Sequence, residues 1–214
     1  MEEKSKNSKI EILGGCLIVL GILLVGCSLA LVFHNHEESQ TAGADAKQDL
    51  PQVIEVIEQA KEAPKEEVHV NPYDILEVEE AQAMTETKIN GYPYIGYLTI
   101  PRISIELPVM TSPTDRRLQI APCRHMGSTK TNDIVIAAHN YPTHFGKLKD
   151  LSQGDVIYFT DMDGIMGLYT VDTVSTISPW DIDLVENSGY DMVLYTCTYG
   201  GSRRVMVGCY LESA

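Results

Sequence analysis

A cysteine, a histidine and an arginine carry the most specific chemical signal in this sequence. Cys197 ends the apolar stretch 192–196, and Arg204 follows after a short connection that contains Gly200 and Gly201. A thiol is a weak nucleophile at neutral pH because its ordinary pKa is about 8.5, and a nearby cation favours the thiolate. Arginine stays charged at any working pH, and it can hydrogen-bond an oxygen that becomes negative. These residues indicate nucleophilic attack on a carbonyl.

The proton acceptor is expected from a distant part of the chain. His139 directly follows the expected strand 133–138, in which residues 134–138 are apolar. Strand ends converge at one rim of a barrel, so His139 and Cys197 can meet, and the histidine can protonate a leaving amine and deprotonate an incoming one. Arg204 is predicted to be the cationic partner because an apolar strand begins directly after it. Alternation places Arg203 on the opposite face.

Short β-branched runs separated by turn residues follow Pro93, and they predict the elements that position these side chains. Their number, seven or eight in about 120 residues, indicates a small closed or nearly closed β-barrel. The Gly-Gly pair predicts a tight hairpin, so the two strands that flank it are neighbours. The expected strands are 94–100, 103–110, 134–138, 156–160, 167–177, 192–197 and 204–211, with helical turns at 114–120 and 145–151.

The N-terminal part contains an apolar run, 12–33, without a charged side chain. About 20 apolar residues at about 1.5 Å each cover the roughly 30 Å of bilayer hydrocarbon. The run is long for a cleaved signal peptide, which favours an uncleaved anchor. Three lysines precede it and two glutamates follow it, so we expect a single-pass type II protein with its later residues outside the cell. An alternative is a lipoprotein signal with an acylated Cys27.

The net charge of −14 lies mostly in one segment. Residues 37–86 hold fourteen acidic residues against three lysines, so the acidity indicates a solvated stalk rather than a cationic substrate. Nucleic acid is not an expected partner, because no basic surface is indicated. The predicted organisation is a cytoplasmic tip (1–11), an anchor (12–33), an acidic stalk with helical parts near 53–60 and 74–88 (34–90), and a catalytic β-barrel (91–214).

Three of the five cysteines lie in the predicted barrel. Three is an odd number, so at least one thiol is unpaired or pairs between chains. Cys209 is expected in the core, and Cys123 has no catalytic arrangement beside it except His125. A zinc site of Cys123, His125, His139 and His144 would match no common ligand spacing.

The sequence resembles the sortase family over residues 94–211. The resemblance rests on several motifs in the family's order. They are Gly96-Tyr97-Leu98-Thr99-Ile100-Pro101, Leu107-Pro108-Val109, Asn132 to His139, Phe145 with Leu148, Leu151 and Gly154-Asp155, and Tyr195-Thr196-Cys197. One departure is Ala138, where the family often has glycine.

The resemblance implies a mainly β fold, an eight-stranded closed barrel with short helices, and a groove that binds a sorting signal similar to LPxTG. The signal would be cleaved before its last residue through an acyl-thioester on Cys197. An amine of a peptidoglycan precursor, a pilin or another surface protein would then resolve it at a Gram-positive cell surface. The implied catalytic residues are His139, Cys197 and Arg204; the implied substrate-binding residues are Thr196, Ala138, Trp180 and Arg203; no cofactor or metal is expected.

Two other readings stay open at this point. An L,D-transpeptidase or a papain-like hydrolase would also use cysteine and histidine, but the sequence context of Cys197 and the order of the two residues fit neither class. A catalytically silent barrel that binds wall peptides would need none of the three residues to react. Asn71-Pro72-Tyr73-Asp74 faintly resembles the lid of some sortases.

Overall fold

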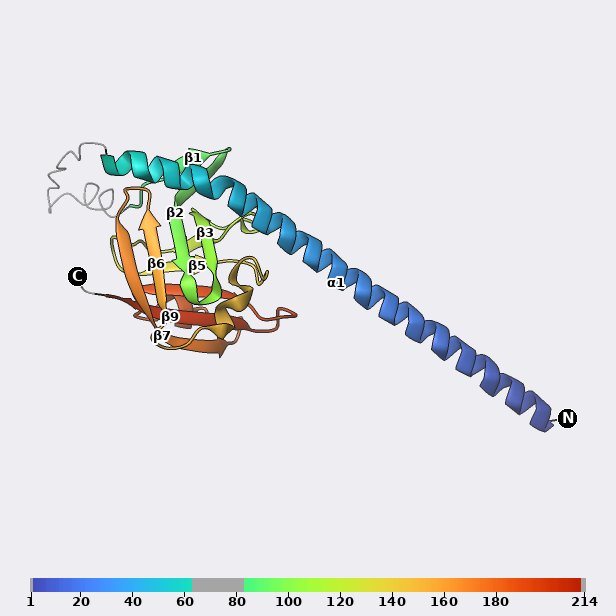
Figure 1. The fold of residues 1–214 in the computed structure, drawn as a ribbon. Coiled ribbons are helices and arrows are strands. Elements are labelled where there is room, and N and C mark those ends of the chain that lie inside the picture. The colour runs from blue at the N-terminus through green and yellow to red at the C-terminus, as the bar shows by residue number, and fades with distance from the viewer. Residues whose placement is uncertain (1, 63–82, 213–214) are drawn as a thin grey trace. The chain divides into compact units, whose positions relative to one another are not determined.

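The computed structural model describes residues 2–62 and 83–212. These described residues divide into two units, one that ends at Glu38 and one that begins at Ser39. The first unit is the beginning of the long helix α1 (Glu2–Glu62). The second unit holds the rest of α1 and a β-barrel (Figure 1). The faint lid motif at 71–74 lies outside the described residues.

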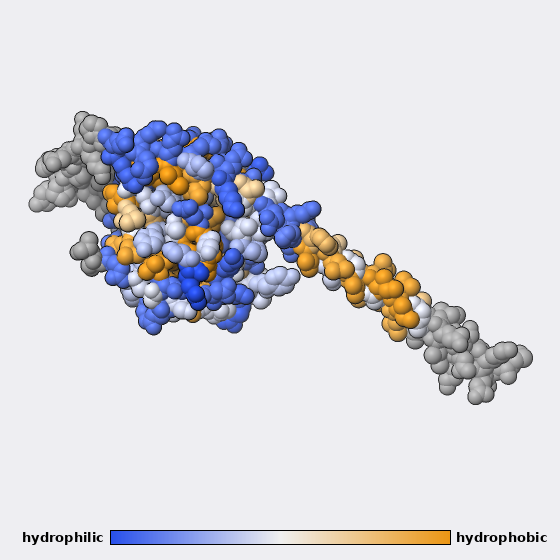
Figure 2. Space-filling model, in the orientation of Figure 1, coloured by the Kyte–Doolittle hydropathy of each residue, from blue (hydrophilic) through white to orange (hydrophobic). Residues whose placement is uncertain are grey.

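The beginning of α1 has a continuous apolar surface. Its large side chains from Leu17 to Phe33 are exposed, and Figure 2 shows the apolar colouring along this stretch of helix. By length and composition, α1 is the helix among the described residues that could cross a membrane. This apolar stretch coincides with the predicted anchor.

The barrel closes through a pairing between strands far apart in sequence. The strands are β1 (Thr87–Ile89), β2 (Tyr92–Ile100), β3 (Ile105–Met110), β4 (Cys123–Met126), β5 (Ile134–Ala137), β6 (Val156–Asp161), β7 (Met166–Ile177), β8 (Met192–Cys197) and β9 (Arg204–Leu211). Their order is β1-β2-β3-β4-β5-β8-β9-β7-β6, and β6 also pairs with β2. Strands β2 to β9 therefore form a closed eight-stranded barrel, which confirms the predicted fold class.

Two short strands were not predicted from the sequence. β1 has three residues, and β4 reads Cys-Arg-His-Met, so neither shows the β-branched alternation that marks a strand. The predicted strand 103–110 begins later, because Pro101–Ile103 forms the 3-10 helix η1. The helix predicted at 74–88 lies mostly outside the described residues, and its last part is wrong because β1 occupies it. The short helices α3 (Asp115–Leu118) and η2 (Phe145–Asp150) agree with prediction.

The segment 39–57 differs from the predicted solvated stalk. It is part of α1 and packs on the outside of the barrel, where Val53 and Ile57 join a buried cluster with Ile89, Tyr94 and Met110. The Asp49 carboxylate accepts hydrogen bonds from the Tyr94 hydroxyl and from the Asn90 amide. The buried apolar positions of the segment 39–57 recur every three or four residues, which is the period of one helix face. They are Ala42, Ala46, Leu50, Val53 and Ile57.

Alternate residues of β5, β8 and β9 face two different environments. Ile136, Leu194 and Val205 point into the barrel and belong to its interior cluster. Val193 and Met206 point outward and pack with Val185 of the short helix α4 (Asp183–Glu186). This outward face, bordered by α4, is the face that carries Cys197.

Candidate active site

Cys197 and Arg204 face one another across the β8–β9 hairpin. They are register partners at the last position of the antiparallel pair. Opposite residues of such a pair lie about 4.5–5.5 Å apart at Cα and project their side chains to the same face. Both residues are half-buried, so a thiol and a cation meet at a position that a substrate can reach. The hairpin predicted from the Gly-Gly pair is confirmed.

The turn of this hairpin is held by its own hydrogen bonds. The Thr198 backbone N–H donates to the Arg203 carbonyl at 2.9 Å, and Gly201 N–H donates to the Thr198 carbonyl at 2.8 Å. Gly200 and Gly201 have φ of 80° and 74°, a region that favours glycine. One Arg204 nitrogen donates to the Gly201 carbonyl at 3.1 Å, which fixes the guanidinium beside the turn.

His139 is brought level with Cys197 by the parallel pairing of β5 and β8. Ala137 is the register partner of Tyr195, so the next residues on the same face are His139 and Cys197. Adjacent strands lie about 4.8 Å apart. Hydrogen bonds bracket this position on both sides: Thr196 Oγ1 donates to the Ala138 carbonyl at 2.8 Å, and Asn140 Nδ2 donates to the Thr198 carbonyl at 3.2 Å.

Thr196 and Ala138 lie inside the barrel rather than on the face of Cys197. They are 3% and 7% exposed, and Ala138 belongs to the interior cluster. Strand alternation turns both side chains inward, and their role as substrate contacts stays a prediction. Their hydrogen bond holds the chain segments that carry His139 and Cys197.

The other two predicted substrate-binding residues are exposed. Trp180 lies between β7 and β8 and is 89% exposed. Arg203 donates to the Thr176 carbonyl of β7 at 2.8 Å, which directs its guanidinium to the neighbouring strand. Trp180 is thus free to meet a substrate, whereas Arg203 already has a structural partner.

Three polar residues on the outward face were missed by sequence reasoning. The Tyr195 hydroxyl lies 2.9 Å from His125 Nδ1, and His125 Nε2 lies 3.5 Å from a Glu186 carboxylate oxygen. Burial raises the pKa of Tyr195, and the positive charge of Arg204 opposes that shift. This network connects β8 and β4 to α4. Strand alternation puts Tyr195 on the face of Cys197 and could have indicated it, but β4 was not predicted.

Three aromatic rings contact one another in sequence in the loop that begins at His139. The ring centroids of His139 and Tyr141 are 5.0 Å apart, and those of Tyr141 and His144 are 5.6 Å apart. Burial lowers the pKa of His144 to about 4, although backbone groups of Ala42 and Ile120 oppose the shift. Neither ring nitrogen of His144 completes a hydrogen bond with a described residue.

The remaining barrel cysteines have no such environment. Burial raises the pKa of both Cys123 and Cys209 to about 12, so both stay protonated thiols. Cys209 belongs to the interior cluster, as predicted. The residues of the zinc alternative have other surroundings: His125 contacts Tyr195, and Cys123 packs with the cluster beneath α1. Among residues 2–62 and 83–212, no group of three possible metal ligands occurs.

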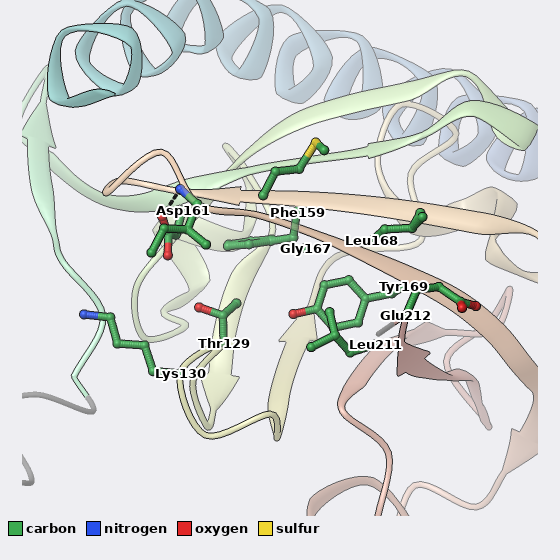
Figure 3. A pocket seen from close by; sticks show the side chains of 11 residues that line it. Thr129, Lys130, Phe159, Asp161, Gly167, Leu168, Tyr169, Leu211 and Glu212 are labelled. Atoms are coloured by element: carbon green, nitrogen blue, oxygen red, sulfur yellow. Dashed lines mark hydrogen bonds between the residues drawn. The ribbon is translucent and has the colours of Figure 1, made fainter. Parts of the chain in front are cut away.

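A separate cavity of about 600 Å³ lies at the other end of the barrel. It is lined by the start of β7, the end of β6 and the end of β9, including Phe159, Tyr169 and Leu211 (Figure 3). Arg204 and Leu211 stand at opposite ends of β9, which at about 3.3 Å per residue separates them by roughly 23 Å. None of the predicted site residues lines this cavity.

Comparison with known sequences gives one family. The family model for the Sortase domain matches residues 98–212. Sortase A of Bacillus anthracis is 32% identical over 113 residues, which are 48% of this chain and 51% of that protein, so the match spans about half of the relative's length. Sortase A of Streptococcus agalactiae serotype III (strain NEM316) is 25% identical over 215 residues, which cover 91% of this chain and 83% of the relative.

Solved structures share the fold at lower sequence identity. A Clostridium perfringens Sortase D5 transpeptidase has a TM-score of 0.58 at 20% identity and covers 79% of this chain and 99% of its own. Sortase A from Corynebacterium diphtheriae has a TM-score of 0.53 at 21% identity, with coverage of 87% and 94%. Sortase C of Streptococcus pneumoniae, whose study concerns catalysis and pilin substrate specificity, has a TM-score of 0.51 at 24% identity, with coverage of 83% and 95%.

Proposed function

This chain belongs to the sortase family of cysteine transpeptidases, and on that premise we propose that Cys197, His139 and Arg204 are its catalytic residues. The observation that carries the proposal is the register of three neighbouring strands. Cys197 faces Arg204 across β8–β9, and hydrogen bonds on both sides bring His139 to the level of Cys197. All three positions belong to the half-buried outward face.

The proposed first step is acylation of Cys197. The thiolate attacks the carbonyl carbon before the last residue of a sorting signal similar to LPxTG, and the carbonyl oxygen becomes negative. A guanidinium N–H of Arg204 donates to this oxygen, an interaction worth about 3 kcal/mol when the donor is well placed. The C–N bond breaks as His139 donates a proton to the departing amine, and a thioester remains on Cys197.

The proposed second step transfers the acyl group. A primary amine attacks the thioester carbonyl, and His139 accepts the proton that this amine loses. The C–S bond breaks, a new amide forms, and the Cys197 thiolate is regenerated. Sortases act on surface proteins with sorting signals and on pilin substrates. For this chain we propose a peptidoglycan precursor or a pilin as the source of the amine.

The exposed side chains near the site are proposed to contact the sorting signal. Trp180 is 89% exposed in the loop that leads to α4, and α4 borders the face of Cys197. An aromatic ring in this position offers a large apolar surface for a side chain of the signal. Arg203 is a weaker candidate, because its guanidinium already bonds Thr176.

Membrane anchoring is the proposed location of the enzyme. Sortases are cell-surface enzymes, and the apolar beginning of α1 could span a membrane. The three lysines before this stretch favour a cytoplasmic N-terminus and an extracellular barrel. A maleimide that cannot cross membranes should label Cys197 in intact cells; labelling only after cell lysis would contradict this orientation.

The decisive experiment uses the full chain in detergent micelles with a panel of pentapeptide sorting signals. Mass spectrometry should detect an acyl adduct on Cys197 that an added amine discharges, with Cys197→Ala as the blank. Arg204→Ala should suppress the adduct, whereas Arg203→Ala, its matched neighbour, should not. If no peptide forms an adduct, the silent binding barrel becomes the better interpretation.

A further inference from the structure

The helix α1 touches the loop that follows His139 at a glycine. Gly43 lies on the buried side of α1, and a Cβ added there would lie 2.8 Å from Cβ and Cγ2 of Thr143. Glycine is disfavoured inside helices, so a glycine at this point has a packing reason. The missing side chain lets the helix backbone approach the loop.

Two polar contacts join the same surfaces. Thr143 Oγ1 donates to the Ser39 carbonyl at 2.7 Å, and it lies 3.1 Å from Ser39 Oγ. Ser39 is 2% exposed, so water competes little for these contacts. The Ser39 carbonyl belongs to a helix backbone, which makes it a rigid acceptor for Thr143.

Backbone hydrogen bonds and packing within the loop connect Thr143 to His139. The N–H of His144 donates to the Tyr141 carbonyl at 2.9 Å, and the N–H of Phe145 donates to the His139 carbonyl at 3.2 Å. Phe145 is fully buried. The Tyr141 ring contacts the rings of both His139 and His144, each in a tilted arrangement. A shift at Thr143 therefore displaces packed neighbours up to the histidine.

A second glycine keeps the loop tightly folded. A Cβ on Gly146 would lie 2.5 Å from the Asn140 carbonyl oxygen. The same Asn140 donates from its side chain to the Thr198 carbonyl, one residue after Cys197. The loop 140–146 thus has α1 on one side and the nucleophile's strand end on the other, with little room to relax.

We propose that Ser39, Gly43 and Thr143 are positioning residues that set the place of His139 relative to Cys197. This inference rests on the proposed function, in which His139 transfers the protons. Under this proposal, residues 39–43 of α1 influence catalysis through the position of His139. These residues immediately follow the segment that contains the candidate membrane span. None of the three residues is proposed to touch the substrate.

The test uses the full chain in detergent micelles and two matched pairs of variants. Thr143→Val removes the hydroxyl at nearly constant shape, and Thr143→Ser keeps it. Gly43→Val forces the helix away from Thr143. Ala44→Val places a valine at the next position, which is exposed. Single-turnover acylation of Cys197 and the ¹⁵N resonances of the His139 ring are measured for each variant, with the melting temperature as a check on folding.

Thr143→Val and Gly43→Val should slow acylation about tenfold, because small misplacements of a reacting group cost rate steeply. Thr143→Ser and Ala44→Val should stay within about twofold of the parent. The His139 resonances should shift only in the two slow variants. Unchanged acylation and unchanged resonances in folded Thr143→Val and Gly43→Val would overturn the inference.

The two proposals fail in distinguishable ways. If the parent chain forms no adduct, the proposed function fails, and the His139 resonances still report whether α1 positions this ring. If the parent is active and all four variants match it, the positioning role fails and the catalytic assignment stands.

Discussion

Cysteine and tyrosine occur both on the outward face near the β8–β9 hairpin and in the barrel interior, where their surroundings differ. Cys197 and Tyr195 are half-buried beside Arg204, whereas Cys209 and Tyr169 are buried in the barrel interior. Burial raises the pKa of both Cys209 and Tyr169 to about 12. In the proposed site, solvent access and a charged neighbour, rather than residue type, distinguish Cys197 from Cys209.

The sharpest test of this comparison is the relative reactivity of the two thiols. A thiol with a pKa of about 12 holds on the order of a thousandfold less thiolate at pH 7 than an ordinary thiol of pKa about 8.5. Iodoacetamide should therefore alkylate Cys197, which is half-buried, much faster than the fully buried Cys209, as followed by peptide mass spectrometry. Comparable rates in the folded protein would remove the contrast between the two environments.

Removing the Arg204 guanidinium should make Cys197 much less reactive towards a sorting peptide. Arg204→Ala should lower the acylation rate by about a hundredfold or more, which is typical for the loss of one donor to a developing oxyanion. Arg203→Ala should change it by less than about threefold, since Arg203 bonds the Thr176 carbonyl instead. Equal losses in the two variants would show that the hairpin needs charge in general and not a partner for Cys197.

The buried His144 should make the free energy of unfolding depend on pH. Burial lowers the pKa of His144 from 6.5 to about 4, so the unfolded chain binds more protons than the folded chain between these pH values. The free energy of unfolding should fall by about 3 kcal/mol as the pH drops through this window. Urea titrations followed by circular dichroism should show this component in the parent and lose it in His144→Phe.

A matched control for that variant is His36→Phe, because His36 is an exposed histidine of α1. It should keep the pH dependence of the parent. Parallel stability curves for the parent and His144→Phe would mean that His144 does not stay neutral when folded.

The smallest expected effect concerns the hydroxyl of Tyr195. Tyr195→Phe removes its contact with His125 and so loosens the connection from β8 to α4, which should raise KM for the sorting peptide about threefold with little change in kcat. Tyr169→Phe, in the interior at the far end of the barrel, should leave both constants unchanged. An equal effect of the two substitutions would point to general destabilisation instead.

The sequence was most informative where local patterns decide the structure. The Gly-Gly turn and the apolar runs on either side of it predicted that Cys197 and Arg204 would be neighbours, and the observed register has this pairing. Strand periodicity located seven of the nine strands, and the family resemblance implied that eight strands would close. Closure depends on the pairing of β2 with β6, a contact between distant segments that no local pattern specifies.

The contribution of α1 was the main feature that sequence reasoning missed. Counting charges described residues 37–86 as a solvated stalk, yet a stripe from Ala42 to Ile57 packs on the barrel. The helical spacing of these small and apolar residues was the available signal, but it was diluted by the acidic residues between them. Thr196 and Ala138 differ from their neighbours in another way: strand alternation turns both side chains inward, away from the face of Cys197.

Barrel closure limits how an extended peptide can bind beside Cys197. Among the described strands, β1 alone pairs on a single side, and its Ile89 is buried in the cluster that includes Val53 and Ile57 of α1. β5, β8 and β9 have partners on both sides, so their backbone groups are already used. An extended chain therefore cannot join this sheet as an extra strand beside Cys197. Recognition of a peptide at this face must come from side chains and loops. Inhibitors should therefore imitate a side-chain pattern rather than a strand.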